Sequence, residues 1–266
     1  MTPPENLPLP PLRVGLFGFG KAGQAVCTEL MKAEDVDLVW VVRQRAEGGP
    51  DAAEAVVGEL QPGQRTPLLG LDRTDIGWLL DERPVDFLID FSAIDTCLSY
   101  ARAAAERGIG IVSAISNYGE RQLGELREAA ASAVVLHSPN ITVGINFVML
   151  AAKALQRLAP HADIEIIEEH FRGKREVSGT ARRIAQALEL DENRHVNSVR
   201  VGGIVGRHEI VFGFPNQTLR LVHDSISRNA FGQGVLFALR ALTGRPPGFY
   251  TMEELVAEGF ADAIRP

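Results

Sequence analysis

A glycine-rich turn near the start of the sequence constrains the fold more than any other feature. The turn, Gly18-Phe19-Gly20-Lys21-Ala22-Gly23, follows an apolar run at residues 12–17 and leads into an apolar-faced segment at 23–32. A second apolar run lies at 37–42. Strand, GxGxxG turn, helix and second strand in this order are typical of a dinucleotide-binding site. In such a site the first glycine makes the tight turn, the second lets the pyrophosphate approach the backbone, and the third lets helix and strand pack closely.

The residues after the second strand indicate which dinucleotide would bind. Sites that prefer NAD usually carry Asp or Glu there, to bond the 2′-hydroxyl of the ribose. This chain has Arg43-Gln44-Arg45 instead. Two guanidinium groups suit a 2′-phosphate, so we expect NADPH as the cofactor, with NADH possible. The alternative is that Arg43 and Arg45 are solvated turn residues.

Strands and helices alternate through the first half of the chain. Further strands are expected at 84–91, 108–114 and 133–137, and helices up to residue 106 and at 121–131, the first of them capped by Ser92 or Asp95. Residues 46–75 hold Gly, Pro and Asp clusters and a short apolar piece at 52–60, and we expect a helix or strand with loops there. The alternation predicts an α/β fold with a doubly wound, Rossmann-type parallel sheet. Ligands of such sheets bind at the carboxyl ends of the strands, here at Phe91–Ser92, at Ala114–Asn117 and at Ser138–Ile141.

The pattern changes after residue 138. A long apolar helix is expected at 147–158, and residues 163–169 alternate like a strand. Three consecutive strands, at 198–205, 209–214 and 218–224, are separated by turns at 206–208 and 215–217, which predicts a smaller α+β domain with a mostly antiparallel sheet. We therefore predict a dinucleotide-binding domain, 1–137 plus about 235–266, and a substrate-binding and oligomerisation domain at 138–234.

The stretch EEHFRGKREVSGTA, residues 168–181, carries the candidate chemistry. It places an imidazole, His170, four residues before the ammonium of Lys174. Ser178-Gly179-Thr180 then opens an apolar segment that is expected to be a helix. Because backbone N–H groups at a helix start bind anions, the combination suits a substrate that bears carboxylates. The alternative is an exposed His and Lys followed by an ordinary N-cap. Asp90, His208 and His223 are expected to have structural or supporting roles.

Composition excludes other classes of partner. The net charge is −7 and no Lys/Arg-rich run occurs, so a nucleic-acid partner is not expected. No apolar run approaches a membrane span, and the N-terminus lacks the features of a signal peptide. Cys27 and Cys97 are expected to be buried thiols in a reducing compartment. We therefore expect a cytoplasmic protein, and no metal site, because no His/Cys/Asp cluster has metal spacing.

Taken together, these motifs resemble those of the dihydrodipicolinate reductase family, in the family's order. Besides the glycine-rich turn and residues 168–181, the similar segments are Ile89–Ser92, Ser138–Asn146, Arg200–Phe212, His223–Gly234 and Gly248–Met252. The resemblance implies NAD(P)H-dependent reduction of a cyclic unsaturated amino dicarboxylate, 4-hydroxy-tetrahydrodipicolinate or dihydrodipicolinate, to tetrahydrodipicolinate in lysine and diaminopimelate biosynthesis. It also implies a homotetramer.

The resemblance assigns roles to individual residues. It implies that His170 is the proton donor and that Lys174 is paired with it. Substrate-binding residues would be Ser178, Gly179 and Thr180. Residues implied to contact the cofactor are Gly18, Phe19, Gly20, Lys21, Ala22, Gly23, Phe91, Ala114, Ile115, Ser116, Ser138, Pro139, Asn140 and Ile141.

The sequence departs from the family pattern at several places, which include a short loop between the helix at Thr180 and Arg200. Phe171 replaces the second histidine, which in the family helps to bind substrate. One residue is missing between Lys174 and Ser178, and the Ala114–Asn117 turn has lost both family glycines. Two other functions therefore stay open: a reductase of the same fold for another imine or oxo acid, and a non-catalytic NADPH-binding regulatory protein.

Overall fold

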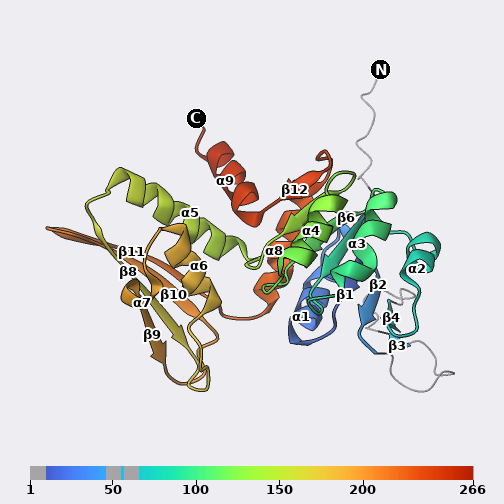
Figure 1. Cartoon of the computed structure of the whole chain (residues 1–266), viewed down its shortest axis with the longest axis horizontal. Helices are drawn as coiled ribbons and strands as arrows, with labels where there is room; N and C mark the ends of the chain where they lie inside the picture. Colours follow the sequence, from blue (N-terminus) through green and yellow to red (C-terminus); the bar gives the residue numbers. More distant parts are fainter. Residues whose placement is uncertain (1–9, 46–54, 57–65, 266) are drawn as a thin grey trace. The chain divides into compact units, whose positions relative to one another are not determined.

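The chain folds into two compact units, each built from two separate segments. The computed structural model describes residues 10–45, 55–56 and 66–265. The first unit combines Met1–Pro139 with Val235–Tyr250, and the second combines Asn140–Gly234 with Thr251–Pro266 (Figure 1). The structure thus differs from the predicted domain boundaries at the C-terminus, where residues 251–266 belong to the second unit instead of the first.

The first unit is built on a parallel sheet. Seven strands run in parallel, in the order β12-β7-β6-β5-β1-β2-β4, and β3 adds an antiparallel edge strand beside β4. Their bounds are β1 Leu12–Phe17, β2 Val36–Arg43, β3 Ala55–Val56, β4 Pro67–Gly70, β5 Phe87–Asp90, β6 Gly110–Ser113, β7 Val134–His137 and β12 Gly248–Tyr250. The predicted doubly wound parallel sheet is confirmed.

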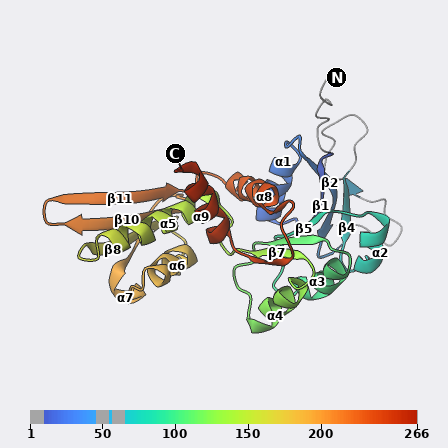
Figure 2. The ribbon, with the colours of Figure 1, turned by 90° about the horizontal axis from the view of Figure 1, so that it is seen from above.

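Helices cover both faces of this sheet, as its continuous apolar strands require. They are α1 Lys21–Leu30, α2 Ile76–Glu82, α3 Cys97–Glu106, α4 Glu120–Ala129 and the part of α8 (Asn229–Leu242) that follows Val235. Figure 2 shows α1 on one face and α3 and α4 on the other. Under α3, Phe17 stacks on Tyr100 with ring centroids 4.7 Å apart, and Trp40 meets Phe17 edge-on. This aromatic cluster anchors the sheet core beside the glycine-rich turn.

The second unit holds a mixed four-stranded sheet in the order β11-β10-β8-β9. Its strands are β8 Asp163–His170, β9 Val196–Arg200, β10 Arg207–Phe214 and β11 Gln217–Asp224. Strand β10 is antiparallel to both β8 and β11. Strand β9 was predicted within an antiparallel series, but it runs parallel to β8. The reason is that α6 (Gly179–Ala187) and α7 (Glu192–His195) form a crossover that returns the chain in the same direction.

Two helices cover one face of this second sheet. Helices α5 (Val143–Leu158) and α6 pack on the strand residues that point the same way, such as Ile164, Ile166 and Phe212 (Figure 2). On the opposite face Val199 and Val222 are each 41% exposed. The last helix, α9 (Met252–Ala263), packs on α5, where the rings of Phe147 and Phe260 lie 5.6 Å apart. This packing explains why residues 251–266 belong to the second unit.

Candidate active site

The glycine-rich turn between β1 and α1 has a backbone that only glycine fits at two positions. Gly18 has φ 100°, and a Cβ there would lie 2.4 Å from the carbonyl oxygen of Phe91. A Cβ on Gly23 would lie 2.0 Å from the carbonyl oxygen of Gly18. At Gly20, by contrast, a Cβ would meet no atom within 4 Å. The turn is therefore closed toward the sheet and open at Gly20, as a cradle for a pyrophosphate requires.

A cavity of about 710 Å³ lies at the carboxyl ends of β1, β2 and β5. Its lining includes six residues predicted to bind cofactor: Gly18, Phe19, Gly20, Arg43, Arg45 and Phe91. The predicted residues Lys21, Ala22 and Gly23 are in α1 and are not among the lining residues. Ser92, which the strand-end rule also predicted, lines the cavity as well, but the sequence analysis missed Ala93–Thr96, together with Leu71 and Ser99. The missed segment follows Ser92 directly, so the strand-end rule should have been extended further past β5.

The remaining predicted cofactor residues do not line this cavity. Ala114 and Ile115 follow β6, and the N–H of Ala114 bonds the carbonyl of Asp90, which places these residues beside the end of β5. Ser138 bonds back to Ser113 in the first unit. Asn140 and Ile141 belong to the second unit, so the segment Ser138–Ile141 spans the boundary between the two.

Asp90, the last residue of β5, fixes the end of this strand through hydrogen bonds to its side chain. Its carboxylate is fully buried and accepts hydrogen bonds from the N–H and hydroxyl of Ser92, from Tyr100 at 2.8 Å and from Tyr118 at 3.2 Å. Burial raises the pKa of Asp90, against the effect of these bonds. Ser92 is therefore not the helix cap that was expected, and the N-cap of α3 is Thr96.

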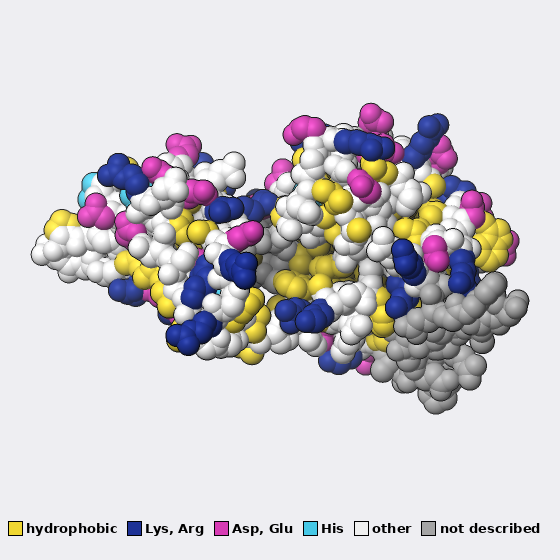
Figure 3. Space-filling model, turned by 60° about the horizontal axis from the view of Figure 1, so that its bottom comes forward, with side chains coloured by type: hydrophobic (Ala, Val, Ile, Leu, Met, Phe, Trp, Pro, Cys, Tyr) yellow, Lys and Arg dark blue, Asp and Glu magenta, His cyan; other side chains and the backbone are white. Residues whose placement is uncertain are grey.

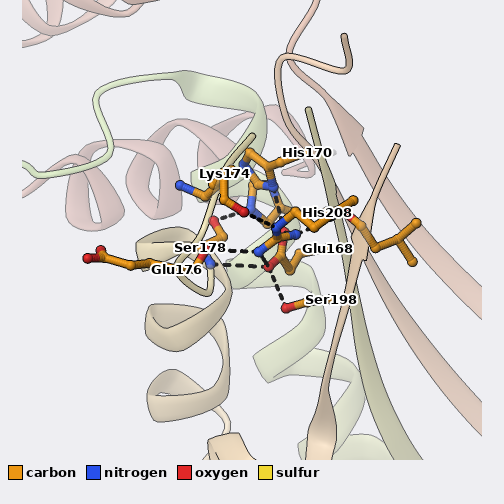
Figure 4. Close-up of polar contacts among 9 residues, drawn as sticks. Glu168, His170, Lys174, Glu176, Ser178, Ser198 and His208 are labelled. Atoms are coloured by element: carbon orange, nitrogen blue, oxygen red, sulfur yellow. Dashed lines mark hydrogen bonds and ion pairs between the residues drawn. The ribbon is translucent and has the colours of Figure 1, made fainter. Parts of the chain in front are cut away.

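In the second unit a buried carboxylate organises the residues of the 168–181 stretch. Glu168 is fully buried on β8. Burial raises its pKa, but hydrogen bonds outweigh this effect and lower the pKa to about 2. The donors are both terminal nitrogens of Arg200 at 2.8 and 2.6 Å, the Ser198 hydroxyl at 2.6 Å, His170 at 2.5 Å and the N–H of Ser178 at 3.2 Å. Figure 4 shows His170, Ser178 and Ser198 around the carboxylate of Glu168.

Glu168 fixes the orientation of His170. Since Glu168 is ionised, it accepts a hydrogen bond from the N–H at Nδ1 of His170, and Nε2 points away from it. Burial lowers the pKa of His170, the bond to Glu168 raises it, and the charges of Lys174 and Arg200 lower it again, with a net lowering. Lys174 lies beside His170 (Figure 4). An imidazole in this setting can hold a proton on Nε2 and release it readily.

Ser178 lies at the start of α6 as predicted, but its hydroxyl does not cap the helix. The hydroxyl oxygen lies 2.7 Å from Nε2 of His208, a buried residue of β10. The next residue, Gly179, is exposed, and a Cβ there would meet nothing within 4 Å. Thr180 donates its hydroxyl hydrogen to the side-chain oxygen of Asn140 at 3.1 Å. The N-terminus of α6 is thus open at Gly179.

The structure brings His170, Lys174 and Ser178 together around Glu168 as one cluster (Figure 4). The sequence analysis assigned no role at this site to Glu168, Ser198 or Arg200, and it assigned His208 a structural role. Glu168 lies two residues before His170 on one strand, and therefore on the same face. That spacing was available in the sequence. The contributions of β9 and β10 depend on strand register, which the sequence does not reveal.

Charged side chains of both signs lie on the face that Figure 3 presents. Lysine and arginine side chains are interspersed with acidic ones there. Within the described ranges, no helix is long and apolar enough to cross a bilayer. Cys27 and Cys97 are both buried and free, as expected.

A dinucleotide turn on a parallel sheet, with an oriented imidazole and an open helix start in a second unit, defines an NAD(P)H-dependent oxidoreductase. Comparison with known proteins specifies the family. The model of the dihydrodipicolinate reductase N-terminus matches residues 12–141, and that of the C-terminus matches residues 141–256. The chain therefore belongs to the dihydrodipicolinate reductase family.

Individual relatives agree with this assignment. A 4-hydroxy-tetrahydrodipicolinate reductase of Caldanaerobacter subterraneus is 34% identical over 65% of this chain and 78% of its own length. One of Myxococcus xanthus is 27% identical over 89% of this chain and 94% of its own. Among solved structures, the dipicolinate-bound dihydrodipicolinate reductase of Paenisporosarcina sp. TG-14 has the same fold, with a TM-score of 0.72 at 22% identity over 91% of this chain and 97% of its own.

Proposed function

We propose that this chain reduces 4-hydroxy-tetrahydrodipicolinate, through dihydrodipicolinate, to tetrahydrodipicolinate with NADPH, in the synthesis of lysine and diaminopimelate. The observation that carries the proposal is the cluster in which Glu168 holds both His170 and the N–H of Ser178. It places a proton donor next to an anion-binding helix start. The substrate offers a conjugated imine to be protonated and carboxylates to be bound.

His170 is the proton donor in this proposal. Glu168 accepts a hydrogen bond from the N–H at Nδ1 of His170, so the proton that His170 gives to the substrate is the one on Nε2. The lowered pKa of His170 makes its protonated form a stronger acid than free imidazole. The charge of Lys174 contributes to this lowering, because a neighbouring ammonium favours loss of the imidazole proton.

Lys174 and the start of α6 bind the carboxylates of the substrate. Lys174 is half-buried and carries a positive charge next to His170. The first N–H groups of a helix have no partner within the helix, and Gly179 leaves space in front of those of α6. We infer that one carboxylate binds at Ser178-Gly179-Thr180 and that Lys174 neutralises charge on the ring or on the second carboxylate.

The first unit fits a nicotinamide dinucleotide. The open side of the turn at Gly20, the 710 Å³ cavity and its two arginines match a pyrophosphate and a 2′-phosphate. When bound, NADPH supplies the hydride for the reduction. We assign Arg43 and Arg45 to the 2′-phosphate, which makes NADPH the preferred cofactor over NADH. An engineered D-amino acid dehydrogenase of similar fold, at 16% identity and a TM-score of 0.57, is described as bound to NADP+.

The test is a coupled assay. Dihydrodipicolinate synthase converts aspartate semialdehyde and pyruvate, and NADPH absorbance is followed after this protein is added. His170→Gln and Lys174→Ala are each expected to lower kcat about 100- to 1000-fold, because each removes a donor aligned on the reacting ring. NADPH binding by both variants, measured by fluorescence titration, should equal that of the native chain. Native rates in both variants would remove the assignment.

Phe171 motivates the second candidate, a reductase of the same fold for another imine or oxo acid. The side chain is 47% exposed in the loop that leads to Lys174, where an apolar ring favours a less polar substrate. A panel of cyclic imines and oxo acids, each tested for NADPH consumption, separates the two candidates. NADPH binding without turnover of any of them would favour the regulatory protein.

We propose further that the protein acts in the cytoplasm as a homo-oligomer, a tetramer by analogy with the family. The buried free thiols suit a reducing compartment, which cell fractionation can test. The uncovered face of the second sheet is the candidate contact surface between copies.

A further inference from the structure

Ser178 behaves unlike an ordinary helix N-cap. A serine at this position usually accepts a hydrogen bond from an N–H of the first turn. In α6 the Ser178 side chain makes no such bond and pairs with Nε2 of His208 at 2.7 Å. The first-turn N–H groups of α6 are thereby left for another acceptor.

His208, which contacts Ser178, belongs to a different strand from Glu168 and His170. It lies on β10, opposite Glu168 of β8 and His223 of β11 in the register of the sheet, and on the face that the helices cover. Its side chain is 4% exposed. Its Nδ1 is buried and has no hydrogen-bond partner among the described residues. Ser178 is therefore the polar group that His208 contacts through its other nitrogen.

The His208 ring is neutral at neutral pH, because burial and then the nearby His170 and His223 lower its pKa to about 4. A neutral ring carries a single N–H, on one nitrogen or the other. If Nδ1 carried it, a buried donor would have no acceptor, which is rare in folded proteins. If Nε2 carries it, the ring donates to Ser178 and only a lone pair is left unmatched. The second tautomer is favoured.

This tautomer decides what Ser178 can do. A hydroxyl that accepts from His208 keeps its own hydrogen free to donate. The free hydrogen lies at the N-terminus of α6, where the helix dipole favours an anion.

We propose that His208 is a positioning residue that holds the Ser178 hydroxyl as a hydrogen-bond donor toward the substrate carboxylate at the start of α6. The proposal rests on the proposed function, because it concerns the same site. It also gives a specificity: a site that presents N–H and O–H donors favours a carboxylate over a carboxamide, whose NH₂ is itself a donor.

The experiment is a double-mutant cycle with His208→Leu, His208→Gln and Ser178→Ala. Losing one hydrogen bond to a charged group raises the substrate KM about 10- to 100-fold, so Ser178→Ala and His208→Leu are each expected in that range. Gln can donate from the same place as Nε2, and His208→Gln should restore KM to within about threefold. In the Ser178→Ala background, His208→Leu should raise the substrate KM further by less than about twofold. The KM for NADPH and the melting temperature serve as controls.

A second readout does not depend on turnover. The dissociation constant of dipicolinate, a planar pyridine dicarboxylate, measured by titration calorimetry, should follow the same pattern across the four variants. The corresponding monoamide should bind the native chain more weakly than dipicolinate and lose this preference in Ser178→Ala. If His208→Leu raises the substrate KM by the same factor in the Ser178→Ala background as in the native chain, His208 acts independently of Ser178 and the proposal is overturned. Absence of activity in the native chain would instead contradict the proposed function.

Discussion

At the scale of residues, the central feature of the second unit is the environment of Glu168. A buried carboxylate is costly unless donors surround it, and Glu168 accepts from Arg200, Ser198, His170 and Ser178. Arg200 supplies the opposite charge through two nitrogens. The same contacts fix the ring of His170 and the backbone of Ser178. Stability and the geometry proposed for catalysis therefore depend on one carboxylate.

Glu168 should make stability depend on pH in a defined window. Its pKa is lowered from 4.5 to about 2 in the folded chain. A carboxyl with a lowered folded pKa stabilises above its unfolded pKa, and the stabilisation is lost as the pH falls through the folded pKa. At 1.36 kcal/mol per unit, about 3 kcal/mol should be lost between pH 4.5 and 2. Urea unfolding followed in the second unit across this range should show the loss in the native chain.

Two matched variants test whether Glu168 causes this pH dependence of stability. Glu168→Gln is expected to be less stable at pH 7 and to lack this part of the pH dependence. Glu176→Gln, which changes an exposed glutamate of the same unit, should keep it. Equal pH dependence in Glu168→Gln and the native chain would contradict the assignment.

The sequence identified the part of the site that is local in the chain. His170, Lys174 and Ser178 fall within nine consecutive residues, so their proximity needs no knowledge of the fold. Arg200 and His208 come from neighbouring strands, and only the pairing of β8 with β9 and β10 brings them to Glu168. A sequence shows alternation along a strand but not the register between strands. This part of the site therefore could not be predicted.

At the scale of elements, the link between β1 and α1 combines a packing constraint with an open side. Gly23 and Gly18 contact backbone atoms so closely that a methyl group has no room. Gly20 is the N-cap of α1, with φ −77° and ψ −171°, a conformation open to any residue. Packing therefore requires two of the three glycines. The third is needed only if something else approaches the turn.

This contrast gives a paired prediction. Gly23→Ala should destabilise the first unit by about 1–3 kcal/mol or more, because the methyl group must displace backbone. Gly20→Ala should change stability by less than about 1 kcal/mol, yet weaken NADPH binding roughly tenfold, because the added carbon occupies the pyrophosphate position. Thermal unfolding and fluorescence titration measure the two effects. Unchanged NADPH affinity in Gly20→Ala would mean that the pyrophosphate lies elsewhere.

Elements with strong apolar runs were predicted closely. Residues 37–42 and 163–169 correspond to β2 and β8, and 147–158 to α5, which begins four residues earlier, at Val143. Strand β4 and helix α2 were not identified, because short polar and Gly/Pro clusters hide them, and most of residues 46–65 lie outside the described ranges. The direction of β9 was wrong because the crossover through α6 and α7 was not recognised.

At the scale of the whole molecule, the second unit has one face of its sheet covered by helices and one face open. The open face carries Val199 and Val222 next to a charged group in which Arg207 contacts Glu169 and Glu209. Exposed valines beside ordered ion pairs suit a contact that is repeated between identical copies.

Val222→Asp should therefore shift the protein toward monomers. The new carboxylate would have to be desolvated in the contact, which weakens association without removing any buried side chain of the unit. Sedimentation velocity over a concentration series measures the shift. Arg121→Asp, which changes an exposed residue of α4 in the first unit, is the control. A native chain that sediments as a monomer would contradict the oligomer proposal.

The position of β12 has a consequence for synthesis on the ribosome. Strand β7 pairs on one side with β6 and on the other with β12, so one edge of Val134–Leu136 stays unpaired until Gly248–Tyr250 have been synthesised. Between them the ribosome must translate all of residues 140–234, which takes on the order of ten seconds. During this time β7 presents an unpaired edge, the kind of template that recruits other nascent chains. The first unit is therefore the first to begin emerging and cannot be completed until most of the second has been made.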